Sequence, residues 1–191
     1  MFRTAALAAA LCLSAGTVFA AAEEYTLDTS HSQVVFSYQH LGFSTTTGMF
    51  SDITGTIAFD AADPAASSVK VSFPVTTLFT GFGDRDKHFL SADLFNGAVN
   101  PTVTFESTSI KVTGEKSAEI TGNLTLNGVT KEVVLDTVMT QQATHPMMNK
   151  PWVGFDATTT LKRTDFNVGI FAPAVSDEVA VTISIEAMKA E

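Results

Sequence analysis

Cysteine is almost absent from this sequence, because Cys12 is the only one in 191 residues. It lies in a segment that has the order of a secretory leader, in which Arg3 precedes an apolar stretch (residues 5–13) and then a run of small residues. Cleavage after Ala20 fits the small-residue rule, and cleavage after Ala22 fits about equally well. A membrane anchor is the alternative, but the apolar stretch is shorter than the roughly 20 residues that a spanning helix needs.

The lack of further cysteine restricts how the mature chain is stabilised and attached. A lipoprotein leader carries its cysteine at the cleavage site after a small residue, whereas here Leu11 precedes Cys12 and Leu13 continues the apolar stretch. We therefore expect no lipid anchor. Residues 21–191 contain no cysteine, so disulfides cannot stabilise them even in an oxidising compartment. Their stability must come from the core and from closure of a sheet.

Basic charge is also scarce. Eleven basic and 20 acidic side chains give a formal net charge of −9, and removal of Arg3 with the leader makes it −10. That charge argues against nucleic acid and against anionic membrane surfaces as partners. After the leader no apolar run is long enough to form a transmembrane segment, and no linker or low-complexity segment divides the chain. We therefore expect one domain over residues 21–191.

Tyrosine and tryptophan are rare, with two and one residues, whereas phenylalanine occurs 15 times. This composition predicts a large apolar interior and leaves open whether the interior is solid or hollow. Apolar residues recur at every second position in five runs, with mostly threonine and serine between them, which is typical of strands with one buried face. The runs are Val34, Phe36, Tyr38 and His40; Val69, Val71, Phe73 and Val75; Ile120, Leu124 and Leu126; Val153, Phe155, Ala157, Thr159 and Leu161; and Val179, Val181, Ile183 and Ile185.

The length and spacing of these runs favour a barrel. Several extend over about 8–12 residues, which suits tilted barrel strands better than short sandwich strands. Asn127-Gly128 between two alternating runs is the best hairpin signature in the chain. Residues 83–95 are charged and do not alternate, so we predict a short helix there, over one opening of the barrel. The prediction is an all-β chain that forms an antiparallel β-barrel with one short helical segment, and an open β-sandwich is the alternative.

Acidic side chains cluster in the helical segment. Asp84 and Asp86 flank Arg85, and Asp93 lies nearby. Such carboxylates can hold a metal or act as acid and base. Pairing with Arg85 and Lys87, together with helix capping, is the interpretation that we favour, because no third catalytic group is evident.

The histidines show no metal-binding spacing. His31, His40, His88 and His145 are scattered, and neither His-x-His nor H-E-x-x-H occurs, so we predict no metal site. His40 ends an apolar strand face, where a hydrogen-bonded core histidine is the favoured interpretation.

One short stretch holds all three residue types of a hydrolytic triad: Asp28-Thr29-Ser30-His31-Ser32. In a strand, successive side chains point to opposite faces, so we expect these groups to be kept apart. A capping or turn role for Asp28 and the serines is therefore the prediction. No G-x-S-x-G motif supports a nucleophile elsewhere.

A series of motifs along the whole mature chain resembles the YceI-like polyisoprenoid-binding family. The series includes Arg85-Asp86-Lys87-His88-Phe89-Leu90, and its segments follow one another in the family's order. One departure is Asn167, where the family often has glycine, although asparagine also tolerates left-handed backbone angles. The segments are residues 25–36, 40–42, 48–50, 85–90, 93–95, 100–105, 122–131, 163–166 and 175–179.

The resemblance implies an extended, lipocalin-like antiparallel barrel that holds a long isoprenoid chain or another lipid. It also implies export to the bacterial periplasm or beyond, and no catalysis. No covalent cofactor is expected, and the bound molecule is an isoprenoid lipid, a quinone or a similar amphiphile. A homodimer is left open.

Residue roles follow from this expectation by inference. For the apolar lining we predict Phe36, Tyr38, Phe50, Phe73, Phe105, Phe155 and Phe166. For the head group at the mouth we predict His40, Arg85, His88 and Arg163. Pure packing is the alternative for any one of the aromatics, and an ion pair with Asp165 or another acid is the alternative for Arg163.

Three hypotheses of function remain at this point. The first is a lipid carrier or scavenger without chemistry. The second is a barrel enzyme that acts on a lipid-like substrate through His40, His88 and the nearby acids. A stress-related protein with an incidental ligand is a third, weaker reading.

Overall fold

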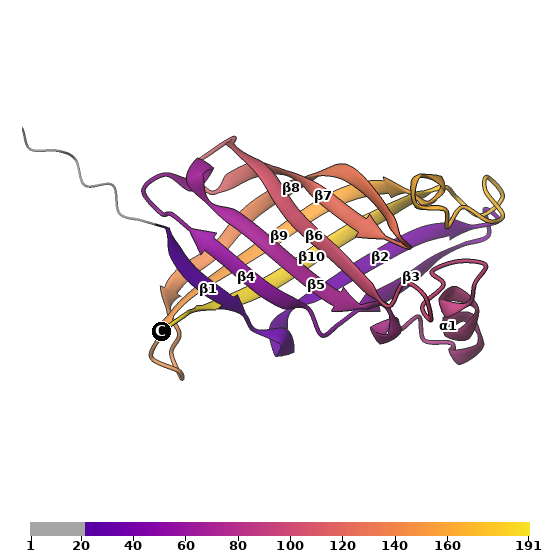
Figure 1. Cartoon of the computed structure of the whole chain (residues 1–191), viewed down its shortest axis with the longest axis horizontal. Helices are drawn as coiled ribbons and strands as arrows, with labels where there is room; N and C mark the ends of the chain where they lie inside the picture. The colour runs from indigo at the N-terminus through magenta and orange to yellow at the C-terminus, as the bar shows by residue number, and fades with distance from the viewer. Residues whose placement is uncertain (1–21) are drawn as a thin grey trace, which may run out of the picture.

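The computed structural model describes residues 22–191, which consist mainly of antiparallel strands (Figure 1). The predicted leader lies outside the described residues. The strands are β1 (Glu23–Leu27), β2 (Gln33–His40), β3 (Ser44–Phe50), β4 (Thr54–Phe59), β5 (Ser68–Pro74), β6 (Thr102–Val112), β7 (Ser117–Leu126), β8 (Val129–Thr144), β9 (Pro151–Lys162) and β10 (Glu178–Lys189). The helical segments are α1 (Gly83–Leu90) and the 3₁₀ turns η1 (Thr29–His31), η2 (Pro64–Ala66), η3 (Val75–Thr77) and η4 (Arg163–Phe166).

Eight of the strands form a closed ring. They follow the order β1, β4, β5, β6, β7, β8, β9 and β10, and β10 pairs back to β1, with Tyr25 opposite Lys189. The β2–β3 hairpin is attached to β10 beside this ring. The predicted barrel is thus confirmed, and the β1–β10 pairing excludes the open sandwich. Closure removes the free strand edges at which such a chain would otherwise aggregate.

One edge of β10 pairs with two strands in succession. Residues 180–184 pair with β2, and residues 187–189 pair with β1. The 3₁₀ turn η1 interrupts what would otherwise be one long strand. The outer edge of β3 is covered in part by the chain before α1, where Met49 and Phe79 exchange two backbone hydrogen bonds of 2.9 Å.

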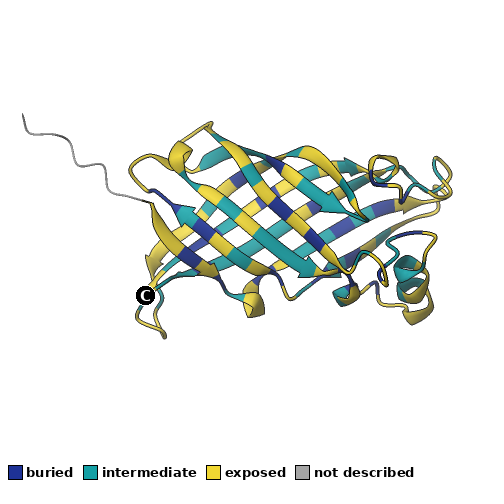
Figure 2. Ribbon diagram, in the orientation of Figure 1, coloured by how far each residue is buried: buried dark blue, intermediate teal, exposed yellow. Residues whose placement is uncertain are grey.

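Alternation along the strands sorts side chains between the interior and the solvent, as the bands of colour in Figure 2 show. The predicted rows face inward, and the residues between them are mostly exposed. One end differs from the prediction, because β5 stops at Pro74 and the buried Val75 belongs to η3.

Two local predictions are confirmed. Asn127 and Gly128 connect β7 to β8 with positive φ angles of 49° and 73°, which a two-residue hairpin turn requires. The helix α1 covers residues 83–90 of the predicted segment and lies at one end of the barrel (Figure 1). In the described part of the chain, no helix is both long and apolar enough to cross a bilayer.

Candidate functional site: an apolar cavity and its mouth

A cavity of about 710 Å³ lies inside the barrel. Its wall consists of the inward rows of β2, of β3 and of the ring strands other than β1, together with α1. Pro64 and Lys116, in the turns after β4 and β6 at the end opposite α1, also border the cavity. Beside β1, a buried cluster packs against this wall: Tyr25, Leu27, Ile53, Ile57, Phe59, Val153 and Ala187. Three members of the cluster border the cavity themselves, so the interior is hollow, which composition left open.

All seven predicted lining aromatics border this cavity. Several also pack on one another, since the ring of Phe50 lies with its centroid 5.6 Å from Phe36 and 5.1 Å from Phe73. Edge-to-face and tilted arrangements of this kind add stability beyond the burial of area. The aromatics therefore both line the cavity and pack on one another, so lining and packing are not exclusive roles.

Two strand glycines hold rings against the wall. A side chain at Gly48 would collide with the ring of Phe36, which lies directly opposite on β2. A side chain at Gly122 would collide with the ring of Phe105 in the same way. Because each ring lies flat over a glycine of the neighbouring strand, it leaves the lumen free.

The four predicted head-group residues also border the cavity, at the α1 end. His40 ends β2, Arg85 and His88 lie on α1, and Arg163 opens η4. His40 is exposed, so the favoured interpretation of a core histidine is wrong. The strand alternation was read correctly, but His40 is the last residue of β2, where the row leaves the interior.

Arg163 holds the loop between η4 and β10 in place. Its Nε donates to the carbonyl of Ser176 at 2.8 Å, and its Nη2 donates to that of Val175 at 2.7 Å. Its Nη1 donates to the carbonyls of Val168 and Ile170 at 2.9 and 3.1 Å. The predicted alternative of an ion pair with an acid is wrong, because these carbonyls take the donors and no carboxylate lies within ion-pair distance in the described chain.

Burial shapes the electrostatics around this arginine. Desolvation lowers the pKa of Arg163, and the charges of Asp177 and Tyr38 oppose that shift. Desolvation also acts on Asp177, but the hydrogen bonds from Thr164 and the charge of Arg163 outweigh it and lower the pKa of that carboxyl. Arg163 stays protonated at neutral pH in spite of its lowered pKa, because guanidinium is a very strong base. Asp177, whose pKa is lowered, is ionised, and Arg163 borders the cavity.

The acids of α1 are already engaged. Asp84 pairs with Lys87 at 3.0 Å, as predicted. Asp86 accepts from the backbone and the hydroxyl of Thr80. Arg85 also binds Thr80, with its Nε 2.8 Å from the hydroxyl oxygen, and its guanidinium carbon lies 6.0 Å from the centre of the Phe82 ring. The predicted pairing is therefore right for Lys87 and wrong for Arg85.

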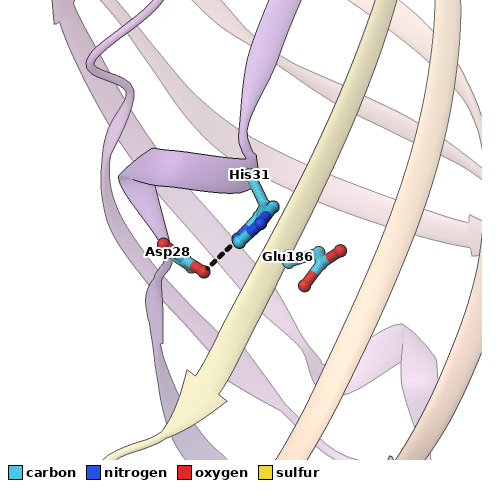
Figure 3. A group of neighbouring side chains, drawn as sticks. All are labelled: Asp28, His31 and Glu186. Atoms are coloured by element: carbon cyan, nitrogen blue, oxygen red, sulfur yellow. Dashed lines mark hydrogen bonds and ion pairs between the residues drawn. The ribbon is translucent and has the colours of Figure 1, made fainter.

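The triad-like stretch forms a compact group on the outside of the barrel (Figure 3). Asp28 caps η1 by accepting from the backbone of Ser30, and its Oδ2 lies 2.7 Å from Nδ1 of His31. The capping prediction is confirmed, but the expectation that a strand separates these groups is wrong, since the cap turns the chain into a 3₁₀ turn. Glu186 of β10 completes a set of potential metal ligands within 4.8 Å, although its Oε2 accepts from Trp152 at 3.0 Å.

Sequence reasoning missed part of the mouth. Phe82, Ile170 and Phe171 also border the cavity and are exposed to solvent. The ring of Phe171 lies 6.4 Å from that of His88, which joins the η4–β10 loop to α1. Phe82 and Phe171 lie in irregular segments, which carry no periodicity from which their position could be read.

A closed antiparallel barrel around an apolar cavity places this protein among the β-barrels that enclose a cavity. Residues 25–187 match the family described as YceI-like domain. Protein YceI of Escherichia coli O157:H7 is 41% identical over 181 residues, covering 95% of this chain and 94% of the relative. A UPF0312 protein of Ectopseudomonas mendocina is 41% identical over 191 residues, covering 97% and 96%. The chain belongs to the YceI-like family.

Solved structures share the fold. The YceI protein of Campylobacter jejuni superposes with a TM-score of 0.72 at 28% identity, covering 80% of this chain and 90% of that one. BcnA of Burkholderia cenocepacia gives 0.76 at 24% identity, covering 84% and 98%. A polyisoprenoid binding domain from Saccharophagus degradans gives 0.68 at 14% identity, covering 87% and 98%.

The left-handed angle at Asn167 confirms one further prediction. Its φ of 58° ends η4, as the glycine usual in the family would. The departure from the family pattern therefore leaves the turn intact, because asparagine adopts this conformation readily.

Proposed function

We propose that this protein binds a long-chain amphiphile, with an isoprenoid as the best-fitting class, for transport, storage or sequestration. The tail occupies the cavity and the polar head lies at the mouth. The observation that carries the proposal is the continuous apolar lining of a cavity of about 710 Å³ inside a closed barrel, a size typical of small-molecule sites. The Saccharophagus degradans neighbour, described as a polyisoprenoid binding domain, supports the class of ligand through the shared fold.

Apolar burial alone supplies enough free energy for such a ligand. Each buried CH₂ contributes about 0.8 kcal/mol, so a tail of about 20 carbons gains on the order of 16 kcal/mol. Lost translational and conformational freedom opposes this by about 4–15 kcal/mol. Affinity therefore comes mainly from the tail, and the polar groups at the mouth set the orientation.

The cations at the mouth favour a head group with oxygen acceptors. Neither Arg85 nor Arg163 has a carboxylate within ion-pair distance in residues 22–191. Arg163 uses four of its five N–H donors on carbonyls, and one N–H of Nη2 remains. Such donors suit a phosphate or a quinone oxygen, with His40 and His88 beside them at the mouth.

We further propose that binding involves no chemistry. Asp84 and Asp86 are engaged with Lys87 and Thr80, so neither is oriented toward a histidine as a general base would require. Among the described residues, the close histidine–carboxylate pair is that of His31 and Asp28, outside the cavity. Incubation of the loaded protein should leave the mass of the ligand unchanged, and a new product mass would favour the enzyme instead.

The leader pattern supports export as the setting of this function. We propose that the mature protein works in the bacterial periplasm or beyond it, where it shields a lipid from water. Intact-mass measurement of protein recovered from a periplasmic extract should show loss of residues 1–20 or 1–22. A full-length cytoplasmic product would contradict the proposal.

Native mass spectrometry of protein purified from its own host tests the binding directly. A stoichiometric long-chain lipid is the expected result. Ala157 lies on an inward row and borders the cavity, so Ala157→Phe should fill the lumen and displace the lipid. Thr160→Phe adds the same ring to an outward position of the same strand and should retain the lipid. Empty wild-type protein that takes up no isoprenoid or fatty ligand would rule the proposal out.

A further inference from the structure

The α1 end of the barrel exposes large apolar side chains to solvent. Phe43 at the β2–β3 turn is 90% exposed, and Phe171 is 59% exposed. Large apolar side chains that are exposed together at one end of a protein are typical of an interaction site. We define the apolar rim as Leu41, Phe43, Phe79, Phe82, Ile170 and Phe171.

The rim residues come from three segments that are tied together. The backbone N–H of Leu41 donates to Ala174 at 3.1 Å, which joins the β2–β3 turn to the η4–β10 loop. The η4–β10 loop contacts α1 through Phe171 and His88, and Phe79 is bonded to β3 through Met49. The rim therefore surrounds the mouth.

The rim is also continuous with the cavity. Phe82, Ile170 and Phe171 border the lumen and solvent at once. A tail that leaves the cavity at this end meets the exposed rim before it meets open water.

The backbone gives a second, independent reason to assign a role to the rim. Left-handed φ angles suit asparagine, aspartate and glycine and disfavour bulky residues. Leu41 and Phe171 have φ angles of 53° and 68°, and both belong to the rim. The other positive-φ residues in residues 22–191, glycine apart, are Asp52, Asn96, Asn127, Asn149 and Asn167.

Neither the backbone nor hydration favours a large apolar residue at these two turn positions. Asparagine would suit both positions better on each ground, as it does elsewhere in the same chain. Phe171 also contacts His88 and borders the cavity. Leu41 does not border the cavity, so a contact of its side chain outside the folded monomer explains the choice at that position.

We propose that the apolar rim docks the mouth of the barrel onto the surface of an electrically neutral lipid bilayer. Phenylalanine and leucine on loop tips can enter the acyl boundary, as interfacial apolar side chains do. The formal net charge of −9 opposes an anionic surface, and α1 carries both signs, with Asp84, Asp86, Arg85 and Lys87. Docking goes beyond ligand binding, because it places the mouth where an amphiphile can move between membrane and cavity without crossing water.

Vesicle flotation tests this docking. The mature protein should float with vesicles of phosphatidylcholine, and added salt should not release it. The variant Leu41→Asn, Phe43→Ser, Phe79→Ser changes three rim residues that do not border the cavity. It should lose vesicle binding by roughly tenfold for each phenylalanine removed. Met147→Ser is the matched control, because Met147 is 86% exposed in the β8–β9 turn at the opposite end of the barrel, and it should float as the wild type does.

Two measurements separate docking from misfolding and from ligand binding. The triple variant should keep or raise the thermal midpoint, because its three side chains are exposed and asparagine suits the left-handed angle of Leu41. It should also still take up an isoprenoid delivered from detergent, as detected by native mass spectrometry. If the wild type floats with vesicles but its own cavity takes up no isoprenoid, the proposed function fails and docking stands.

Three results would overturn the docking proposal. The triple variant could float as well as the wild type, or binding could require anionic lipid. The wild type could also stay off the vesicles and instead self-associate in sedimentation experiments, with the association lost in the triple variant. That result would assign the rim to a second copy of this chain.

Discussion

The two ends of the barrel are built from the same sheet but differ in what they do with apolar side chains. At the β1 end, Leu27 and its neighbours are packed into a buried cluster. Ion pairs lie outside that end, with Lys189 2.6 Å from Glu23 and Lys150 2.7 Å from Glu191. At the α1 end the cavity opens, Arg163 ties a loop through backbone carbonyls, and the apolar rim is exposed.

This contrast indicates that the two ends of the barrel have different roles. The buried cluster beside β1 carries stability that residues facing the cavity supply less of, since a void removes contact partners from its lining. The open end carries access to the cavity and is stabilised by polar contacts to the backbone. Each of the following predictions tests one side of this contrast.

The largest effect should come from matched truncations in the packed and hollow regions. Leu27→Ala removes a buried side chain of the packed cluster and should lower the free energy of unfolding by about 2–5 kcal/mol. Leu135→Ala removes a half-buried side chain that borders the cavity and should cost only about 1 kcal/mol. Urea denaturation measures both. Equal losses would mean that the middle of the barrel is packed as densely as the β1 end.

The next effect concerns the arginine at the mouth. Arg163→Lys keeps the charge but loses the forked donors that bind four carbonyls. We expect a loss of about 2–4 kcal/mol in the free energy of unfolding. Hydrogen exchange should show faster exchange in residues 167–177 and unchanged protection at the β1 end. Uniform loss of protection over both ends would contradict a local role.

A smaller effect is expected where a ring lies over a glycine. Gly48→Ala places a methyl group against the ring of Phe36, so the ring must turn toward the lumen. Overpacking of this kind costs about 1–3 kcal/mol, and the narrowed lumen should weaken lipid binding roughly tenfold. Gly83→Ala is the control, because a Cβ there meets nothing within 4 Å. Unchanged lipid affinity in Gly48→Ala would show that Phe36 can move without entering the cavity.

The smallest effect is a pH dependence at the η1 turn. The hydrogen bond and charge of Asp28 raise the pKa of His31 above its ordinary value of 6.5. Desolvation acts to raise the pKa of Asp28, but hydrogen bonds from Ser30 and His31 lower it below its ordinary value of 3.8. Protonated His31 and ionised Asp28 therefore stabilise the fold between these two ordinary values.

That contribution should fade as pH rises through the raised pKa of His31 and as pH falls through the lowered pKa of Asp28. It should be small, since solvent screens an exposed pair. The pH dependence of the urea midpoint, compared between wild type and His31→Gln, measures it. If the urea midpoints of the two proteins differ most above pH 8, the result contradicts a stabilising pair of protonated His31 and ionised Asp28.

Much of the fold could be predicted from local patterns. The period-two rows, the Asn127-Gly128 turn and the charged break at α1 were all readable, because each depends on neighbours in sequence. The capping role of Asp28 was also readable, but the η1 turn that brings Asp28 and His31 together was not, because strand alternation predicts them on opposite faces. His40 was misplaced for a related reason, since alternation does not show where a strand leaves the interior.

The candidate site was predictable in composition and not in arrangement. The lining aromatics lie on regular strands, so their inward side followed from the rows. Arg163 was expected to meet either a ligand or an acid, whereas it binds carbonyls of a loop up to 13 residues away. Phe82 and Phe171 lie in irregular segments, and only the three-dimensional path of those loops brings them to the mouth.

The sequence by itself determined an all-β chain without disulfides in residues 21–191, with phenylalanine-rich inward rows and turns at definite places. These features follow from residue type and from spacing of one or two positions. The tertiary structure alone decided that β1 closes on β10, that the interior is hollow, and that an apolar rim lies at the mouth. Those outcomes depend on contacts between residues far apart in the chain, such as Tyr25 with Lys189 and Leu41 with Ala174.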